Sequence, residues 1–255
     1  MTLEAMKREY LPIHNTFERL ASSYSRSTGM EEVNRRELAP VAREWDGRIL
    51  DVGAGAGAFI EKYMNPSKNE ITAVDFSFNM IEETRMRLES FLGRSLFLSQ
   101  ALAQALPFKR DSFDAALSVN TLHNMPSFDD VAQALSEMAR VVRPRGLILA
   151  EFRNLDNPQR RRICELHDHP ELPQKAYTFE QIEQAFSRMG FEVERRIPLW
   201  GDVAPEGPLN EAIDRLKKSF GKMQDSLSPR FAVVARKGPG FRSVLRDALG
   251  VPVVE

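Results

Sequence analysis

Residues 49–60, ILDVGAGAGAFI, decide the fold class of this chain. An apolar run ends in a glycine-rich turn and apolar residues then resume, which is typical of a strand, a tight loop and a helix. The glycines at positions 53, 55 and 57 permit positive φ angles and let a ligand approach the backbone. Residues 53–58 also match the G-x-G-x-x-G/A pattern of dinucleotide-binding loops. The glycines alone therefore leave more than one cofactor class open.

Composition and charge narrow the class of protein. The 255 residues suit one domain with additions, and 35 Lys and Arg against 36 Asp and Glu give a net charge of -1, so we expect no nucleic-acid partner. The single cysteine, Cys164, excludes an internal disulfide. Since there is no apolar run of about 18 residues and no signal peptide, we expect no transmembrane segment and an intact cytoplasmic chain. The oligomeric state is left open, a homodimer included.

Short apolar runs alternate with helical patterns from Arg48 onward. This alternation predicts an α/β fold: a Rossmann-like, doubly wound, mostly parallel seven-stranded sheet with a closing antiparallel pair. The expected strands are 48–52, 70–75, 95–99, 113–119, 146–152 and the antiparallel pair 191–199 and 231–236. The expected helices are 59–64, 79–92, 128–142, one that begins with a capping box at Thr178, and 210–223.

Four segments lie outside this alternation or interrupt it. An N-terminal helical arm (1–40) precedes the main domain (41–237), and an amphipathic tail (238–255) follows it. Within the domain, residues 153–175 form a polar insert and residues 201–229 a helical one. Ligands of open α/β sheets bind at the carboxyl ends of the strands, so we expect the arm and the first insert to cover the site. The tail is expected to pack on its own domain or to contact a partner or membrane.

Asp51 distinguishes between the cofactor classes. It places a carboxylate at the end of the first strand, beside the loop where a dinucleotide's pyrophosphate would bind, and like charges weaken such binding. A cofactor with an ammonium group gains instead, because a charge-assisted hydrogen bond contributes about 1.5–3 kcal/mol. Asp51 therefore favours an ammonium-bearing cofactor, while an NAD(P)-dependent oxidoreductase is the less favoured alternative.

The D-x-G-x-G-x-G pattern that begins at Asp51 resembles motif I of the class I S-adenosylmethionine-dependent methyltransferases. Other segments resemble later motifs of that family, in its order: AVDFS (73–77), ALAQALPF (101–108), SFDAA (112–116), TLHNM (121–125) and LSEMARVVRPRG (135–146). FERLASSY (17–24) resembles the arm helix of the subgroup that includes ubiquinone and menaquinone biosynthesis methyltransferases.

This resemblance spans about residues 14–237 and implies an activity. S-adenosylmethionine (SAM) would donate a methyl group to a small-molecule, lipid-linked or sugar-linked acceptor, with S-adenosylhomocysteine (SAH) as product. A module that binds SAM or SAH without catalysis is the alternative from another class.

The resemblance also implies a set of cofactor-binding residues. Asp75 takes the place of the acid that binds both ribose hydroxyls in a bidentate contact. Leu102 takes the place of an acid that reaches the adenine amino group, and the loss of that hydrogen bond is expected to weaken binding by about 1 kcal/mol. The full set is Asp51, Gly53, Ala54, Gly55, Gly57 and Asn120 at the methionine end, Asp75 at the ribose, and Phe76, Met80, Leu102 and Ala103 around the adenine.

Four residues are candidates for catalysis or acceptor binding. His123 follows the fourth strand and has an unperturbed pKa near neutrality, so it is a candidate base or orienting group, or else it only caps the loop. Tyr24 in the arm either closes over the cofactor and substrate or is a core aromatic. Arg153 and Asn154, which precede Arg160–Arg162, suit an acidic or phosphate-bearing substrate, or else belong to a solvated face.

No metal site is expected. His167 and His169 form an H-x-H pattern, but a third confident ligand is missing.

Overall fold

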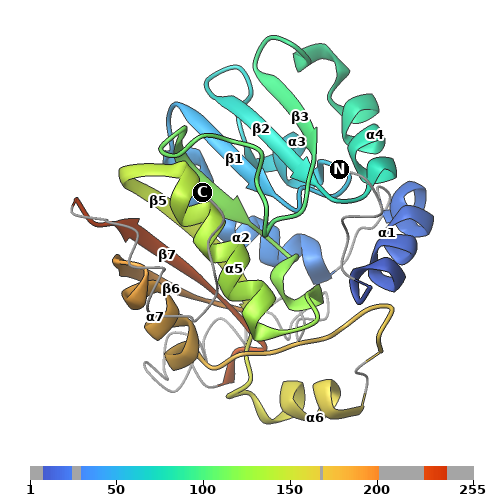
Figure 1. Cartoon of the computed structure of the whole chain (residues 1–255), viewed down its shortest axis with the longest axis vertical. Helices are drawn as coiled ribbons and strands as arrows, with labels where there is room; N and C mark the ends of the chain where they lie inside the picture. The colour runs from blue at the N-terminus through green and yellow to red at the C-terminus, as the bar shows by residue number, and fades with distance from the viewer. Residues whose placement is uncertain (1–7, 25–29, 167–168, 201–226, 240–255) are drawn as a thin grey trace, which may run out of the picture.

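The computed structural model describes residues 8–24, 30–166, 169–200 and 227–239 (Figure 1). These residues form a seven-stranded sheet with the order β3-β2-β1-β4-β5-β7-β6. Its strands are β1 (Arg48–Val52), β2 (Glu70–Asp75), β3 (Leu96–Gln100), β4 (Phe113–Ser118), β5 (Val142–Arg153), β6 (Phe191–Leu199) and β7 (Arg230–Lys237). The pairs among β1 to β5 are parallel, whereas β7 is antiparallel to both β5 and β6. The predicted fold class is confirmed.

Helices cover both faces of the sheet (Figure 1). They are α1 (Tyr10–Tyr24), α2 (Met30–Glu44), α3 (Ala58–Tyr63), α4 (Phe78–Arg87), α5 (Phe128–Val141), α6 (Pro158–Leu166) and α7 (Phe179–Arg188), with two short 3-10 helices, η2 (Glu89–Phe91) and η3 (Leu122–Asn124). Successive side chains of a strand point to opposite faces. Leu50 of β1 accordingly packs into the core beneath α5 and α7, while Ile49 packs into the core formed with α2 and α3.

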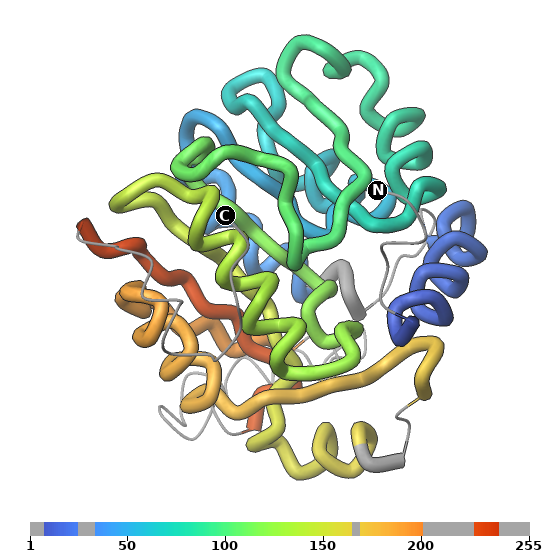
Figure 2. Tube along the Cα trace, in the orientation of Figure 1, coloured from blue at the N-terminus to red at the C-terminus, as the bar shows by residue number. Residues whose placement is uncertain are grey.

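Chain direction and strand order fix where a ligand can bind. The connection from β1 leads to β2 on one side, whereas β4 pairs with the other side of β1. Such a switch in strand order leaves a crevice at the carboxyl ends of the strands. The glycine loop after β1 opens into that crevice, and the tube in Figure 2 shows α1 lying beside α4 near the same end of the sheet.

Several element bounds differ from the sequence prediction. The predicted helix 79–92 is divided, because Leu88 leaves helical geometry at φ -118° and ends α4, after which η2 follows. Strand β5 begins at Val142 rather than at residue 146, since Val142 already pairs with Phe113. Helix α2 continues past residue 40 to Glu44. The predicted capping box at Thr178 is confirmed, with Gln181 as its partner.

Two expected segments lie outside the described residues: most of the insert 201–229, with its expected helix 210–223, and most of the tail 238–255. None of the helices that the structure describes is long and apolar enough to span a membrane.

Candidate active site

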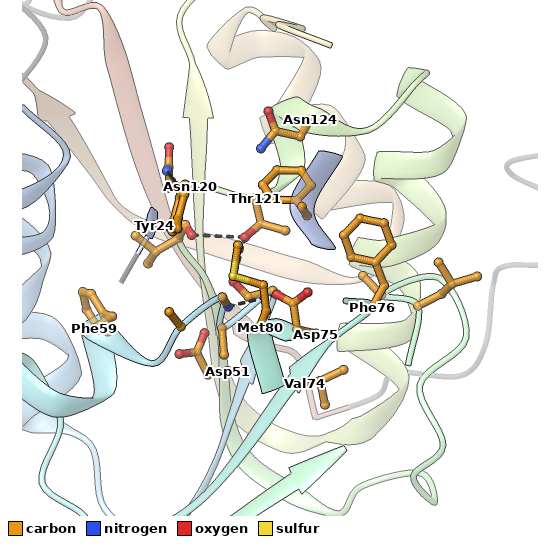
Figure 3. Close-up of a pocket in the computed structure, with 18 of the residues that line it drawn as sticks. Tyr24, Asp51, Phe59, Val74, Asp75, Phe76, Met80, Asn120, Thr121 and Asn124 are labelled. Carbon is orange, nitrogen blue, oxygen red and sulfur yellow. Dashed lines mark hydrogen bonds between the residues drawn. The ribbon is translucent and has the colours of Figure 1, made fainter. Parts of the chain in front are cut away.

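A cavity that is open to solvent lies at the carboxyl ends of the central strands. Helix α1 supplies one wall, the glycine loop and the ends of β2 and β3 supply the second, and the residues after β4 supply the third. Figure 3 shows Asp51 and Asp75 on one side of this space, with Asn120, Thr121 and Asn124 on the other. The predicted residues on its walls are Tyr24, Asp51, Gly53, Ala54, Gly55, Asp75, Phe76, Met80, Leu102, Ala103 and Asn120.

Asp51 is a buried carboxylate at one wall of the cavity. It lies in β1 with Ala73 of β2 and Leu117 of β4 as its register partners, and it is 2% exposed. Burial raises the pKa of Asp51 to about 7, repulsion by Asp75 adds to this effect, and Arg35 opposes it. The site therefore holds a carboxylate that gains from a cationic ligand.

Asp75 is the last residue of β2 and is buried as well. Its Oδ2 accepts a hydrogen bond from the Gly55 N–H at 2.9 Å, and its Oδ1 accepts one from the Ser77 N–H at 2.9 Å. Burial raises the pKa of Asp75 to about 6, although these backbone hydrogen bonds act in the opposite direction. Asp75 thus joins the glycine loop to the start of the next helix.

The glycine loop needs its glycines for two different reasons. Gly53 has φ +75°, and a Cβ atom there would lie 2.2 Å from the Thr121 side chain. Gly57 has φ +74° and precedes α3, where a Cβ would press on Thr84 of α4. Gly57, which the sequence places with the cofactor-binding residues, is not among the lining residues and instead lets α3 pack closely.

The arm helix α1 is held against the sheet by contacts near the cavity. The Glu18 carboxylate accepts hydrogen bonds from the N–H groups of Phe78 (2.6 Å) and Asn79 (3.3 Å) in the first turn of α4. Phe17 packs edge-on against Phe76 at 5.8 Å between ring centroids. These contacts place the aromatic side of α1 over the cavity.

Asn120 joins the arm to the far end of the sheet. Its side-chain amide donates to the Tyr24 hydroxyl at 2.8 Å, and its Oδ1 accepts from the Arg230 guanidinium at 2.7 Å. Its backbone N–H donates to Glu151, which forms a buried 2.9 Å ion pair with Arg230. Asn120 adopts φ 56°, a left-handed conformation that destabilises a non-glycine residue by about 1–2 kcal/mol. The surrounding contacts hold it in this conformation at the cavity wall.

Besides Gly57, three predicted residues do not reach the cavity. His123 is 2% exposed and is absent from the lining, and burial together with Arg153, Arg230 and Arg160 lowers the pKa of its imidazole well below the usual range. Arg153 is buried outside the cavity wall. Asn154 is buried too, and its amide donates to the Ser228 carbonyl at 2.8 Å. The expected contacts of these side chains with the substrate therefore lack a geometric basis at this cavity.

Other lining residues were missed by sequence reasoning. Arg35 of α2 is the most consequential, because it is buried at the cavity and lowers the pKa of Asp51. Nothing local distinguishes it within the charged helix sequence MEEVNRRELAPVARE. Thr121 and Asn124 also line the cavity, although within the TLHNM segment the sequence pointed to His123. The missed residues also include Tyr10 and Phe17.

No metal centre is formed by the described residues, which contain no group of three or more metal-ligating side chains. His167 of the H-x-H pattern falls outside them.

Comparison with known proteins establishes the cofactor class. Residues 50–150, which include the glycine loop, Asp51 and Asp75, match the family model described as a methyltransferase domain. The chain is 27% identical to the ubiquinone/menaquinone biosynthesis C-methyltransferase UbiE of Bartonella henselae over 215 residues, which is 79% of this chain and 80% of the relative. The chain is an S-adenosylmethionine-dependent methyltransferase. SAM is thus its cofactor and SAH its product.

Solved structures share the fold of this methyltransferase. A SAM-dependent methyltransferase of Thermotoga maritima superposes with a TM-score of 0.61 at 21% identity, covering 88% of this chain and 99% of that one. The 1,6-didemethyltoxoflavin-N1-methyltransferase of Burkholderia thailandensis, solved with its substrate and SAH bound, superposes with a TM-score of 0.61 at 16% identity, covering 92% and 91%. At these identities the likeness shows the fold alone.

Proposed function

We propose that this methyltransferase transfers the methyl group of SAM to a small-molecule acceptor bound between α1 and the residues that follow β4. The observation that carries the proposal is the pair of buried carboxylates, Asp51 and Asp75, which face one cavity from neighbouring strands. The cavity continues from these acids to Asn120 and Asn124, which gives an acceptor a place beside the cofactor. A ubiquinone/menaquinone biosynthesis C-methyltransferase among the relatives and the 1,6-didemethyltoxoflavin-N1-methyltransferase among the similar structures support a small acceptor.

The residues present fit the cofactor. Asp51 would pair with its ammonium group and Arg35 with its carboxylate, while Asp75 would accept hydrogen bonds from the ribose hydroxyls. Both carboxyl groups have a pKa raised by burial, so a ligand with a positive charge and hydroxyl donors stabilises their ionised forms.

The adenine would pack among apolar side chains at the ends of β2 and β3. Phe76, Met80 and Leu102 line this part of the cavity, and Ala103 offers backbone groups for hydrogen bonds in place of an acid. The backbone of the glycine loop, with Ala54 between Gly53 and Gly55, would approach the methionine end.

When bound, SAM supplies a methyl group activated on a sulfonium. The protein's task is then alignment of the acceptor and exclusion of water, which Tyr24, Phe17 and Asn120 perform by closing the cavity. The described lining residues include no histidine, and burial raises the pKa of Tyr10, so Tyr10 stays protonated. We therefore propose an acceptor whose nucleophilic atom is reactive without a dedicated base.

Calorimetry with SAM and SAH tests the cofactor site. We expect both to bind the wild type, and Asp75→Ala to weaken binding by more than tenfold, because two charge-assisted hydrogen bonds are lost. Glu82→Gln, which changes an acid on the outer side of α4, is the matched control and should leave binding unchanged. Absence of binding at millimolar concentration would contradict the proposed function, and unchanged affinity of Asp75→Ala would remove the ribose assignment.

Labelled methyl transfer into a cell lysate tests the acceptor class. We expect label from SAM to accumulate in the low-mass fraction only when the protein is present. Label confined to protein or nucleic acid would refute a small-molecule acceptor while leaving the cofactor site intact.

A further inference from the structure

Gln104 is a polar side chain at the edge of the part of the cavity where we place the adenine. The Ala101 N–H donates to the carbonyl of Asp75, our proposed ribose ligand, at 3.0 Å. Residues 101–104 follow β3 and all four line the cavity, so this segment leads from the ribose position along the adenine position. Gln104 is the last residue of the segment and carries its one polar side chain.

A tight turn holds Gln104 beside the apolar residues of this wall. The Ala105 N–H donates to the Leu102 carbonyl at 3.0 Å, which closes a turn over residues 102–105 with Gln104 in its third position. Gln104 is buried, and its amide nitrogen lies 3.9 Å from the sulfur of Met125, another lining residue. The side chain is therefore fixed at the cavity wall just beyond Leu102.

The hydrogen bonds of Tyr10 determine how the Gln104 amide is oriented. The Tyr10 hydroxyl is hydrogen-bonded both to the Asp130 carboxylate and to the Gln104 amide. A carboxylate can only accept hydrogen bonds, so the single proton of the hydroxyl is donated to Asp130. The Tyr10 oxygen then acts as an acceptor towards Gln104, which must present its NH2 group to it.

Asp130 is itself held in place in the first turn of α5. It is buried, and its Oδ2 accepts a hydrogen bond from the Ser127 hydroxyl at 2.6 Å. Burial and the negative charge of Asp130 raise the pKa of Tyr10, so the phenol keeps the proton that it donates. The orientation of the amide is thus set by a chain of three side chains from α5, the arm and the turn after β3.

The carbonyl oxygen of Gln104 is left as an acceptor at the cavity wall. With the NH2 group turned to Tyr10, Oε1 accepts no hydrogen bond from any residue that the structure describes. The adenine of SAM has a matching donor, its 6-amino group, which lies on the six-membered ring, whereas the ribose is attached to the five-membered ring. A base packed against Phe76, Met80 and Leu102 would therefore direct this group away from Asp75, towards Gln104. Leu102 cannot accept its hydrogen bond, and a buried donor without a partner costs about 1–3 kcal/mol.

We propose that the Gln104 carbonyl accepts a hydrogen bond from the 6-amino group of the cofactor's adenine, and that Asp130, acting through Tyr10, holds the amide in this orientation. Gln104 is then a specificity-determining residue for the base, and Tyr10 and Asp130 are positioning residues. The inference rests on the proposed function, because it uses the adenine position assigned there.

The first experiment compares SAH with an analogue that carries unsubstituted purine in place of adenine. The analogue keeps the ring nitrogens and lacks only the 6-amino group. By calorimetry, we expect the wild type to bind SAH about threefold to tenfold more tightly than the purine analogue, which corresponds to one net hydrogen bond.

Variants at position 104 assign this preference to the side chain. Gln104→Met has a similar shape without an acceptor, so it should bind SAH about threefold to tenfold more weakly and the two ligands equally within about twofold. Gln104→Glu keeps an acceptor and should retain the preference. Gln184→Leu, which changes an exposed glutamine of α7, is the control and should behave like the wild type. Thermal unfolding of each variant without ligand shows that it is folded.

The second experiment tests the orienting role of Tyr10 with an SAH analogue that carries hypoxanthine. Its 6-oxo group is an acceptor and would face the Gln104 carbonyl, so the wild type should bind it at least about tenfold more weakly than SAH. Tyr10→Phe removes the contact that fixes the amide, which can then turn and donate its NH2 group to the 6-oxo group. The preference for SAH over the hypoxanthine analogue should therefore fall by about threefold or more in this variant. A role of Tyr10 in packing alone would leave this ratio unchanged.

Three outcomes would overturn the proposal or part of it. Equal affinity of the wild type for SAH and the purine analogue would show that the 6-amino group has no acceptor in the site. A preference that persists in Gln104→Met would assign that group to another acceptor. An unchanged ratio in Tyr10→Phe would remove the orienting role of Tyr10 and Asp130. In each case SAH still binds and the proposed function stands, whereas a wild type that does not bind SAH would contradict that function itself.

Discussion

The two ends of the cavity differ in charge and in the way the chain builds them. At the cofactor end, Asp51 and Asp75 place two carboxylates at the ends of neighbouring strands. Beyond the other end, Arg230 and Arg153 place guanidinium groups behind Asn120. The acids follow short sequence motifs, whereas Arg230 and Asn120 lie 110 residues apart. This difference indicates that the acidic end, where we propose that the cofactor binds, is encoded by local sequence. The opposite end, where we propose that the acceptor binds and which we call the acceptor end, depends on the complete sheet.

The largest effect is expected from breaking the ion pair at the acceptor end. Glu151→Gln removes the carboxylate from a pair whose two side chains are nearly fully buried. It should lower the free energy of unfolding by about 3–5 kcal/mol, because breaking one side of a buried ion pair leaves a poorly compensated charge.

Urea unfolding measures this loss. The control Glu82→Gln, which loses only a surface ion pair with Arg85, should change stability by less than about 0.5 kcal/mol. The double variant with Arg230→Met should recover part of the loss. A loss below about 1 kcal/mol for Glu151→Gln would show that the Glu151–Arg230 ion pair contributes little to the free energy of unfolding.

At the cofactor end, removing a carboxylate should raise the free energy of unfolding instead of lowering it. The pKa of Asp51 is about 7 in the folded protein, against an ordinary value of 3.8. Between these values the folded state binds the proton more tightly than the unfolded chain, so Asp51 lowers stability as pH rises through this window. Asp51→Asn should therefore be more stable than the wild type by about 2–4 kcal/mol at pH 8 and nearly equal to it at pH 4.

Urea unfolding across this pH range tests the stability change, and calorimetry tests the matching change in function. Wild-type SAM affinity should fall as pH decreases below 7, because Asp51 must lose its proton to pair with the ammonium group. Asp51→Asn should bind SAM at least tenfold more weakly and without this dependence. A stability difference that is constant from pH 4 to pH 8 would contradict the titration of Asp51.

The smallest effect is expected at the hydrogen bond between Asn120 and Tyr24 of the arm helix α1. Tyr24→Phe removes the hydrogen bond from Asn120 to α1 and should lower kcat/KM about threefold to tenfold, which corresponds to a net hydrogen bond of about 0.5–1.5 kcal/mol. SAM affinity should stay within twofold. Ser23→Ala, at an exposed neighbouring position of α1, is the control. Equal kcat/KM for Tyr24→Phe and Ser23→Ala would show that this contact does not align the acceptor.

The cofactor end could be predicted from the sequence because its signals are local. The bounds of β1 and β2 were predicted correctly, since each is a short, mainly apolar run with an acid at its last or next-to-last position before a turn. The structure brings Asp51, Asp75 and the adenine-side residues to one cavity. Their contacts with the cofactor stay a prediction.

The acceptor end could not be predicted because it depends on contacts between distant segments. Arg230 contacts Asn120 because β7 lies between β5 and β6 in the sheet, and no local sequence pattern predicts that contact. Sequence position also misplaced His123. It stands between Leu122 and Asn124 in η3, but its side chain is buried away from the wall that Asn124 lines. Within this single turn of 3-10 helix, Asn124 lines the cavity and His123 does not.

The contact of Glu18 with α4 has a consequence for energetic coupling. Glu18 supplies, from 60 residues away, the acceptor for the first N–H of the helix that follows Asp75. Undocking of α1 therefore removes the acceptor of the Phe78 and Asn79 N–H groups in the first turn of α4, and the Asp75 carboxylate is attached to that turn through Ser77. A ligand on Asp75 that orders this turn tightens the docking of the arm, and by reciprocity a docked arm tightens the ligand by the same factor.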